Sequence, residues 1–366
     1  MLSAADHAYM SQALRLAERG LTTTMPNPRV GCVIAADGAV VGEGWHERAG
    51  ESHAEIHALR QAGVHARGAT AYVTLEPCSH HGRTPPCADA LVAAGVQRVV
   101  VAMRDPNPQV AGKGIQRLLD AGVSVQTGLM QAQAESLNPG FISRMTRGRP
   151  WLRLKVAATL DGKTALNNGV SQWITGPDAR RDAHRLRARS CAMLTGIGTV
   201  LSDNPAFNVR DVETTRQPLK VVVDTHLRMP LDAKMLEGAP VLVATASQDA
   251  TRIRALELAG AEVLSMPASP SSMGGVDLHC LLTELGRREF NEMTVEAGQV
   301  LNGALLQAGL VDELVMYMAP ILFGDRARGM FGLPEMTEMG MRLDLEVSDM
   351  RMLGKDVRIT ARIKES

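Results

Sequence analysis

The chain has few aromatic residues and no excess charge of either sign. Phe, Trp and Tyr make up 3% of its 366 residues, and 39 basic residues balance 39 acidic ones. Proteins that bind nucleic acids or anionic membranes through charge carry a basic excess, and aromatic side chains stack on flipped bases. We therefore expect neither nucleic acid nor a membrane as a partner. With few aromatic residues and 20 methionines, aliphatic side chains and Met should fill the core.

Cysteines are also few, and long apolar runs are missing. The five cysteines are an odd number in a long chain, which argues against a disulfide framework. The stretch MLSAADHAYMSQALRLAERG lacks the basic and apolar regions of a signal peptide, and no run approaches the roughly 18 apolar residues of a membrane span. The expected location is a reducing cytoplasm. Cys32, Cys191 and Cys280 lie in apolar sequence and are predicted to be buried.

Strands and helices alternate along the whole chain, which predicts an α/β fold. A length of 366 residues predicts two or three domains. The basic segment 143–150, SRMTRGRP, is a candidate linker, so we expect domains at 1–147 and 148–366. The expected strands are 30–35, 39–44, 69–77, 96–103, 123–128, 151–158, 218–224, 240–245, 292–298, 312–322 and 356–363. The expected helices are 4–19, 53–63, 87–95, 114–122, 177–190, 278–290 and 299–310. The long irregular stretch 203–218 is a candidate functional loop.

Four residues in the first half carry a zinc signature. His53 and Glu55 form His-x-Glu, and Cys78 and Cys87 follow in EPCSHHGRTPPC. Three His or Cys ligands leave the fourth tetrahedral position of Zn²⁺ for water, which is the pattern of a catalytic site. Zinc lowers the pKa of water toward about 7, and Glu55 could carry the protons. His-x-Glu, then Pro-Cys and a second Cys, is typical of nucleobase deaminases, although here eight residues separate the cysteines instead of two.

A structural zinc site is the alternative to a catalytic one. Such a site would need a fourth protein ligand, which His57, His80 or His81 could supply. The presence of Glu55 in the deaminase position favours catalysis.

Polar residues near the zinc motif could recognise a substrate. Asn27 lies between two prolines, so its amide could contact a heterocycle, although a plain turn explains it equally well. His46 precedes the motif, and His80 lies in the loop between the cysteines. These donors suit a small phosphorylated, nucleotide-like molecule, and the alternative is a solvated loop.

The chain resembles one branch of the cytidine-deaminase superfamily, the bifunctional riboflavin-biosynthesis deaminase/reductases. The resemblance rests on PNPRVG, GEGWHERAGESHAEIHAL and EPCSHHGRTPPC, and the long cysteine spacing is typical of that branch. It continues through LKVAATLDGKTA, SQWIT, GIGTVLSDNP and VEAGQVLNGALLQAGLVDELVMYMAPILFG, so it spans most of the chain.

The resemblance implies two consecutive reactions. The first domain would be a three-layer, cytidine-deaminase-like fold that deaminates a diaminohydroxy-pyrimidine carrying a phosphoribosylamino group. Zinc would be held by His53, Cys78 and Cys87, with Glu55 as proton carrier. The residues of the deaminase pocket would include Asn27, His46 and His80. The second domain would be dihydrofolate-reductase-like and would use NADPH to reduce the opened ribosyl side chain to ribityl.

The resemblance also assigns residues to the reductase site. Lys155 and Asp203 would be polar residues at its catalytic centre. The residues in contact with substrate would be Ser171, Arg187, Phe207, Arg210 and Glu296. The residues in contact with NADPH would be Ala157, Trp173, Thr199, Asp203, Gly298, Gln299, Val300, Leu301, Asn302 and Gly303.

The residues themselves support part of this assignment. VEAGQVLNG predicts a strand, a turn and the N-terminus of a helix, an arrangement that can bind a cofactor phosphate. Without the resemblance, a plain strand-to-helix turn would be the default interpretation. The segment does not match the dinucleotide-binding motif G-x-G-x-x-G. Lys155 should project from the opposite strand face to Leu154 and Val156. Asp203 stands in SDNP, which is also good turn sequence.

The helix predicted at 177–190 contains five arginines. Most are predicted to form a solvated face, and Arg187 is predicted to bind a phosphate together with Arg210 of the long loop. The arginines are Arg180, Arg181, Arg185, Arg187 and Arg189.

Two other functions compete with the bifunctional enzyme. One is a nucleic-acid deaminase, such as a tRNA-editing enzyme, with an unrelated second domain; the low aromatic content and zero net charge disfavour it. The other is a structural zinc domain fused to a nucleotide-sensing module, which would not need Glu55. We also expect a homo-oligomer, a dimer or tetramer, with the apolar strand DELVMYMAP as a candidate interface.

Overall fold

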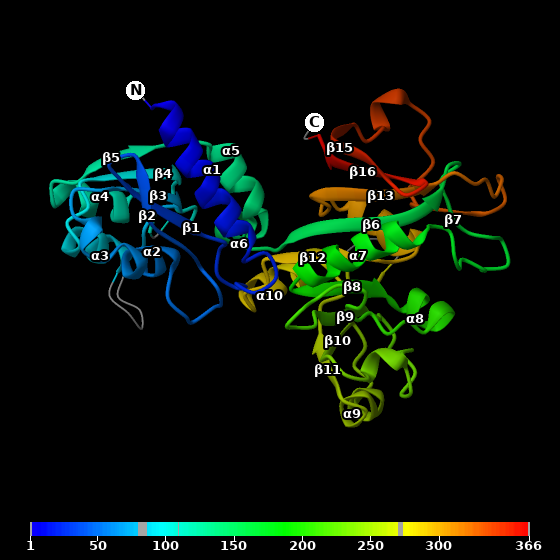
Figure 1. Ribbon diagram of the computed structural model, residues 1–366. Coiled ribbons are helices and arrows are strands. Elements are labelled where there is room, and N and C mark those ends of the chain that lie inside the picture. Colours follow the sequence, from blue (N-terminus) through cyan, green and yellow to red (C-terminus); the bar gives the residue numbers. More distant parts are fainter. Residues whose placement is uncertain (1, 80–85, 109, 270–273, 365–366) are drawn as a thin grey trace. The chain divides into compact units, whose positions relative to one another are not determined.

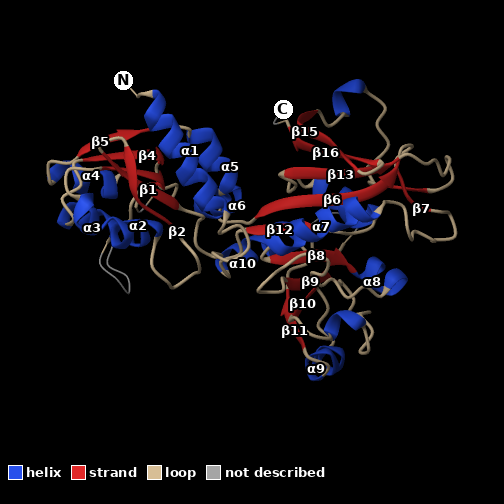
Figure 2. Cartoon of the chain, in the orientation of Figure 1, coloured by secondary structure: helices blue, strands red, loops and turns tan. Residues whose placement is uncertain are grey.

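The chain forms two compact units, Met1–Gly148 and Arg149–Ser366 (Figures 1 and 2). The computed structural model describes residues 2–79, 86–108, 110–269 and 274–364. Each unit has its own sheet and its own apolar core, so each is described separately.

The first unit is built on a five-stranded sheet with the order β2-β1-β3-β4-β5. Its first three neighbours run antiparallel, while β3, β4 and β5 run parallel. The strands are β1 (Gly31–Ala36), β2 (Ala39–Trp45), β3 (Thr70–Leu75), β4 (Arg98–Met103) and β5 (Ser124–Thr127). A hairpin with a two-residue turn joins β1 and β2. Its turn residues Asp37 and Gly38 have φ values of 51° and 78°, which a type I′ turn requires.

Helices cover both faces of this sheet, so the predicted three layers are confirmed (Figure 1). One face packs against α1 and α5, and the other packs against α2, α3 and α4. The helices are α1 (Ala4–Glu18), α2 (Ala54–Ala62), α3 (Cys87–Ala93), α4 (Lys113–Asp120), α5 (Gln131–Leu137) and α6 (Pro139–Arg147), and a 3₁₀ turn, η1 (Gly63–Ala66), follows α2. Ser3 and Asp6 form a capping box at the start of α1.

The second unit is built on a nine-stranded sheet with the order β11-β10-β9-β8-β12-β6-β13-β16-β15. The strands from β11 to β13 run parallel, and β16 and β15 add an antiparallel edge. The strands are β6 (Trp151–Thr159), β8 (Ala192–Gly196), β9 (Leu219–Val223), β10 (Val241–Thr245), β11 (Ala261–Ser265), β12 (Glu292–Val295), β13 (Glu313–Ala319), β15 (Leu345–Leu353) and β16 (Asp356–Ile363). A separate small sheet pairs β7 (Lys163–Ala165) with β14 (Arg328–Gly329).

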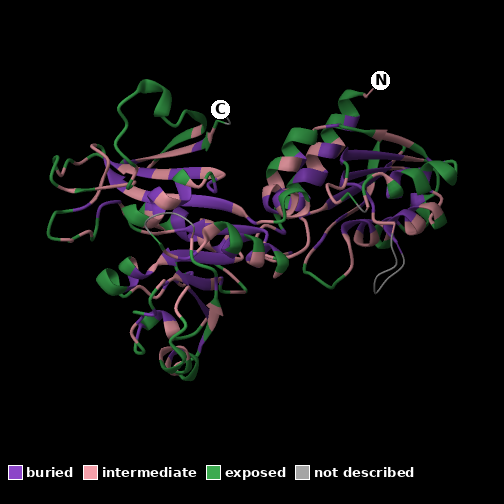
Figure 3. Ribbon diagram, turned by 180° about the vertical axis from the view of Figure 1, so that it is seen from behind, coloured by how far each residue is buried: buried purple, intermediate pink, exposed green. Residues whose placement is uncertain are grey.

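The helices of the second unit also lie on both faces of its sheet, and the central strands are buried (Figure 3). On one face, Leu152, Leu154 and Val156 of β6 pack with leucines of α10 and α11. Lys155 and Ala157 alternate with them and face α7, as the strand period predicts. The helices are α7 (Pro177–Arg189), α8 (Ile197–Asp203), α9 (Ala250–Leu258), α10 (Leu278–Arg287) and α11 (Gln299–Gln307), with 3₁₀ turns η2 (Lys234–Leu236) and η3 (Met339–Met341).

Three predictions about single segments are wrong. Most of the candidate linker 143–150 is helical, because α6 continues to Arg147 before Gly148 ends it with a φ of 69°. The candidate interface strand β13 lies inside the sheet between β6 and β16, so it has no free edge. Of the three cysteines expected to be buried, only Cys32 is fully buried, whereas Cys191 is half-buried and Cys280 is exposed.

The sequence predicts neither a disulfide framework nor a membrane-spanning helix. All five cysteines are free, so no disulfide framework exists. No helix in the described ranges combines the length and apolar character that crossing a bilayer requires.

Candidate active sites

Three predicted zinc ligands converge in the first unit. His53 precedes α2 as its N-cap residue, Cys87 is the first residue of α3, and Cys78 lies just after β3. Their donor atoms all lie within 4.8 Å of one another. The Nδ1 atom of His53 is 3.6 Å from Cys78 Sγ and 3.3 Å from Cys87 Sγ. One imidazole and two sulfur donors at this spacing fit a zinc ion.

The local backbone prepares Cys78 to act as a thiolate. The main-chain N–H of Cys87 donates to Cys78 Sγ at 3.2 Å, and the N–H of Ala88 donates to the Cys78 carbonyl at 3.2 Å. Hydrogen bonds from Cys87 and His53 lower the pKa of Cys78 to about 4. The thiolate is the form that binds metal.

Glu55 lies in the first turn of α2 beside this cluster. Its side chain is buried, and burial raises the pKa of Glu55 to about 7. A nearby metal cation acts in the opposite direction, because it favours the carboxylate. A buried carboxyl group that can exist in both forms near neutral pH is suited to accept and return a proton.

Asn27 and His46 lie together next to the zinc ligands. His46 is buried, and burial lowers its pKa, so the ring is neutral. The Nδ1 atom of His46 is 3.2 Å from the Ser52 carbonyl, which can only accept, so Nδ1 carries the proton. Nε2 then accepts from the Asn27 amide at 3.0 Å. The rings of His46 and His53 meet edge to face at 5.3 Å, so this pair reaches the edge of the metal site.

A fourth protein ligand is missing from the described part of this cluster, which contains His53, Cys78 and Cys87. His57, one candidate for that ligand, is not among them; its buried Nε2 atom has no hydrogen-bond partner among the described residues. The other two candidates, His80 and His81, lie outside the described residues, as does the predicted substrate contact of His80. The described donors thus occupy three positions of a tetrahedral zinc site and leave one without a ligand from the described residues.

Glu76, the first residue of EPCSHHGRTPPC, holds the strand end that carries Cys78, a role that the motif does not reveal. Its buried carboxylate accepts main-chain hydrogen bonds from Asp105 at 3.1 Å, Gly112 at 3.0 Å, Gly114 at 2.9 Å and Ile115 at 3.2 Å. A Cβ on Gly114 would lie 1.9 Å from the Pro77 carbonyl, so the N-terminus of α4 contacts this turn directly. No local pattern around Glu76 reveals these distant partners.

Replacing Glu76 with Gln is expected to destabilise the first unit by about 2–4 kcal/mol and to weaken zinc retention. The amide would direct N–H groups at main-chain N–H groups, and buried donors would lose their acceptors. Thermal unfolding and zinc loss to a chelator would measure the two effects. The matched control is Glu18→Gln, an exposed position at the end of α1. Zinc retention equal to that of the control would contradict this role for Glu76.

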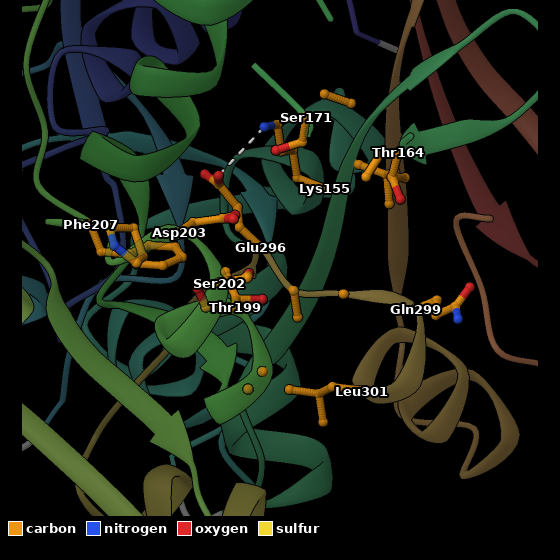
Figure 4. A pocket seen from close by; sticks show the side chains of 18 of the residues that line it. Lys155, Thr164, Ser171, Thr199, Ser202, Asp203, Phe207, Glu296, Gln299 and Leu301 are labelled. Atoms are coloured by element: carbon orange, nitrogen blue, oxygen red, sulfur yellow. Dashed lines mark hydrogen bonds and ion pairs between the residues drawn. The ribbon is translucent and has the colours of Figure 1, made fainter. Parts of the chain in front are cut away.

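A cavity of 1040 Å³ lies in the second unit where the carboxyl ends of its parallel strands meet (Figure 4). Ligands of open α/β sheets bind at this edge. The walls come from β6, α7, α8, the segment after α8, and the turn between β12 and α11. Thr199, Ser202 and Asp203 line it from α8, and Gln299 and Leu301 from α11.

A carboxylate and two cations form the polar centre of this cavity. Glu296, just after β12, accepts from Arg187 Nε at 2.7 Å and from a terminal nitrogen of Arg187 at 2.8 Å. Lys155 Nζ lies 3.4 Å from the same carboxylate (Figure 4). Although burial opposes ionisation, Arg187 and Lys155 hold the pKa of Glu296 well below its usual range. Lys155 and Glu296 meet because β6 and β12 are paired in register, with Leu154 opposite Val295.

Most residues predicted for the reductase site line this cavity. They are Lys155, Ala157, Ser171, Trp173, Arg187, Thr199, Asp203, Phe207, Arg210, Glu296, Gly298, Gln299, Val300 and Leu301. Asn302 and Gly303 are not in the lining. Asn302 is buried and donates to the carbonyls of Ala297 and Met330 at 3.1 Å each. A Cβ on Gly303 would lie 2.2 Å from the Gly332 carbonyl, so Gly303 packs directly against the backbone there. Asn302 and Gly303 therefore support the turn from the side that faces away from the cavity.

The cavity lining is strongly cationic. Among the described residues, seven basic side chains line it, against the two carboxylates of Asp203 and Glu296. The basic residues are Lys155, Arg180, Arg187, Arg210, Arg228, Lys234 and Arg328. No motif in the sequence points to Arg228, Lys234, Arg328 or His184 as lining residues. Thr164 and Ser202 lie in LKVAATLDGKTA and GIGTVLSDNP, but the resemblance assigned them no role.

The arginines of α7 have different environments. Arg181 and Arg185 are exposed, as predicted for a solvated face, while Arg189 pairs with Glu292. Arg187 is engaged by Glu296 and also donates to the Asn208 carbonyl at 3.1 Å. The guanidinium of Arg187 is therefore committed to protein groups, which favours Arg210 over Arg187 as a ligand for phosphate.

Two family profiles match the chain, one in each compact unit. Residues 3–103 match the cytidine and deoxycytidylate deaminase zinc-binding region. Residues 150–359 match the RibD C-terminal domain.

Similar proteins of known sequence or structure match over nearly the full length. The riboflavin biosynthesis protein RibD of Escherichia coli strain K12 is 50% identical over 365 residues, covering 96% of this chain and 98% of that protein. RibD of Haemophilus influenzae is 45% identical, covering 98% and 97%. The structure of Acinetobacter baumannii RibD, form 1, matches with a TM-score of 0.91 at 45% identity and 99% coverage of both chains. A deaminase/reductase of Thermotoga maritima matches with a TM-score of 0.86 at 32% identity, covering 98% and 99%.

Proposed function

The chain belongs to the RibD family of bifunctional deaminase/reductases of riboflavin biosynthesis, and we propose that its first unit performs the deamination and its second the reduction. The observation that carries this division is that each unit holds one complete chemical site. The zinc donors and Glu55 lie in the first unit, and the cationic cavity with its strand-turn-helix lies in the second. The alternative of a nucleic-acid deaminase does not account for the second unit.

In the first unit, the substrate would be diaminohydroxyphosphoribosylaminopyrimidine, the compound named for the Thermotoga maritima relative. Zinc held by His53, Cys78 and Cys87 supplies Lewis acidity that makes water nucleophilic near neutral pH. Glu55 accepts a proton from the attacking water and returns it to the departing amino group, which leaves as ammonia. Asn27 and His46 orient the pyrimidine edge beside these groups.

In the second unit, the deaminated product would be reduced at its opened ribosyl group. NADPH would supply the hydride, and the turn Gly298–Leu301 at the N-terminus of α11 would hold a phosphate of the cofactor. Lys155 places a cation at the polar centre, where negative charge develops on the reacting carbonyl or imine group. Asp203 and Ser171 orient the ribosyl hydroxyls, and Arg210 binds the substrate phosphate.

Incubation of the protein with the diaminopyrimidine ribotide, with and without NADPH, tests both halves of this proposal. Ammonia should be released in either case, whereas NADPH should be oxidised only after deamination. Direct addition of 5-amino-6-(5-phosphoribosylamino)uracil should support NADPH oxidation without ammonia. A zinc-replete sample that releases no ammonia would overturn the deaminase assignment, and one that oxidises no NADPH with the uracil compound would overturn the reductase assignment.

Arg228→Gln is expected to raise the KM for NADPH by about tenfold and to leave the KM for NADH unchanged. Arg228 and Lys234 are exposed cations in the cavity lining and form no ion pair within the described ranges. Such cations suit the additional phosphate that distinguishes NADPH from NADH, and loss of one charged contact costs about a factor of ten. The control is Arg254→Gln on α9, whose side chain is 70% exposed and outside the cavity. Equal effects on both cofactors would assign the phosphate to other residues.

We also propose that the chain forms a homo-oligomer, through the sheet edge of the second unit. The edge strand β15 exposes Val347 at 53%, Met350 at 63% and Met352 at 61%. These residues share one sheet face with Val357, Ile359 and Ala361 of β16 by strand register. Monomeric proteins rarely expose such a contiguous apolar surface at an unpaired edge, and a second copy would cover it through a two-fold axis.

Met350→Glu is expected to reduce the solution mass to that of one chain. A charge on this face would have to be buried without a partner in the assembly. Light scattering after gel filtration measures the mass, and Leu258→Glu on α9 is the control, because Leu258 is at least as exposed as Met350 and lies on another element. A wild-type protein that is monomeric at micromolar concentration would contradict the proposed interface.

The five free cysteines support a reducing, cytoplasmic location.

A further inference from the structure

Two residues on one side of α7 hold the irregular segment after α8. His184 and Arg187 are separated by three positions, so they lie on the same helix face. Arg187 donates to the Asn208 carbonyl at 3.1 Å, and the main-chain N–H of Arg210 donates to His184 Nδ1 at 3.2 Å. The Arg210 guanidinium donates to Asn208 Oδ1 at 3.2 Å. The segment 208–210 is thus fixed at both ends from one helix.

The hydrogen bond from Arg210 determines the protonation of His184. A main-chain N–H can only donate, so Nδ1 must accept, and the ring proton lies on Nε2. Nε2 is 3.6 Å from the Asp211 carboxylate, which suits an N–H directed toward it. Burial and the neighbouring charges of Arg187 and Arg210 together lower the pKa of His184 to about 4, and Asp211 and Glu296 oppose this effect only in part. The neutral ring keeps its acceptor throughout the neutral range.

This segment depends on side-chain anchors, because it belongs to no helix or strand. Phe207 and Asp211, at its two ends, have φ values of 49° and 62°, in the left-handed region that non-glycine residues rarely adopt. Between them, Val209 is held by the Gln217 side chain at 2.6 Å and 3.1 Å. Without the acceptor on His184, the N–H of Arg210 would lose its partner and the turn would lose its contact with α7.

We propose that His184 is a positioning residue of the reductase site. It accepts the main-chain hydrogen bond of Arg210 and so keeps the Arg210 guanidinium at the cavity, where it binds the phosphate of 5-amino-6-(5-phosphoribosylamino)uracil, the uracil ribotide. His184 and Arg210 both line the cavity, but His184 is only 4% exposed while Arg210 is exposed. His184 acts through Arg210 instead of touching the reacting atoms. This proposal rests on the proposed reductase function and adds how its phosphate-binding arginine is placed.

Three substitutions of His184 distinguish the effect of losing the hydrogen-bond acceptor at Nδ1 from the effect of losing the volume of the ring. Asn has its amide oxygen where His carries Nδ1, Gln reaches to the place of Nε2, and Leu has neither acceptor. His184→Leu and His184→Gln should raise the KM for the uracil ribotide by about tenfold, the effect of losing one hydrogen bond, with kcat changed less than about threefold. His184→Asn should restore the KM to within about threefold of wild type, and the KM for NADPH should stay the same in all three.

Hydrogen exchange of the peptide covering 204–218, read by mass spectrometry without substrate, tests the anchor independently of activity. Exchange should increase in the Leu and Gln variants and stay near wild type in the Asn variant. Equal exchange in all variants, or a KM in the Asn variant as high as in the Leu variant, would overturn the proposal. A wild-type protein that does not oxidise NADPH would instead overturn the reductase function, and the exchange measurement would still decide whether His184 holds the segment.

Discussion

Glu55→Gln is expected to reduce ammonia release by about a thousandfold while leaving the reduction of 5-amino-6-(5-phosphoribosylamino)uracil intact. The amide has nearly the shape of the carboxyl group, so α2 and the zinc ligands should stay in place. It cannot accept the proton of the attacking water, and Glu55 is buried, so bulk water cannot take over this role. The loss should therefore appear in kcat of the deaminase alone.

Zinc content, measured by atomic absorption, separates loss of the proton carrier from loss of the metal. It should equal that of wild type, and Glu51→Gln, an exposed position just before the zinc motif, should be fully active. An active Glu55→Gln variant would mean that another group carries the proton. A variant without zinc would mean that Glu55 supports the metal site instead.

Lys155→Met is expected to lower kcat of the reductase by about a hundredfold while NADPH still binds with wild-type affinity. Lys155 supplies a cation at the polar centre of the cavity, and Met has a similar length without the charge. Glu296 keeps its two contacts with Arg187, so the carboxylate is not left unpaired and the unit should remain folded. Stopped-flow oxidation of NADPH with the uracil ribotide measures the step, and fluorescence titration measures cofactor affinity.

Lys364→Met is the control for Lys155→Met, since Lys364 is exposed and lies outside the cavity. Ammonia release should be unchanged in both variants, because it belongs to the other unit. If Lys155→Met instead raised the KM for NADPH at constant kcat, Lys155 would be a cofactor ligand without a role in the chemical step.

The zinc site could be predicted because its chemistry is local in the sequence. His53 and Glu55 are two positions apart, and the cysteines lie in one short segment, so residue type and spacing carry most of the information. The alternation of strands and helices also predicted the α/β class and both faces of β6. In the second unit, Lys155 and Glu296 are 141 positions apart and meet only through the pairing of β6 with β12.

The misses have physical reasons of the same kind. The basic and polar residues at the end of α6 are typical of a linker, yet they belong to a helix that Pro139 begins and Gly148 ends. The apolar β13 was expected at an interface, but an apolar strand is equally suited to the middle of a sheet. Glu76 and His184 act on main-chain N–H groups, which every residue except proline has, so no side-chain pattern identifies their partners.

The seven basic side chains of the reductase cavity also affect the speed of binding. The whole chain has a formal net charge of zero, so the excess of positive charge in this lining is a local feature and not a property of the whole protein. Both the reduced nicotinamide cofactor and the ribotide are anions, so they would be attracted before contact and enter faster than neutral molecules. Screening by salt acts over about 8 Å at physiological ionic strength. The entry rates of both anions should therefore fall together as ionic strength rises, while the rate of hydride transfer in the filled cavity should not.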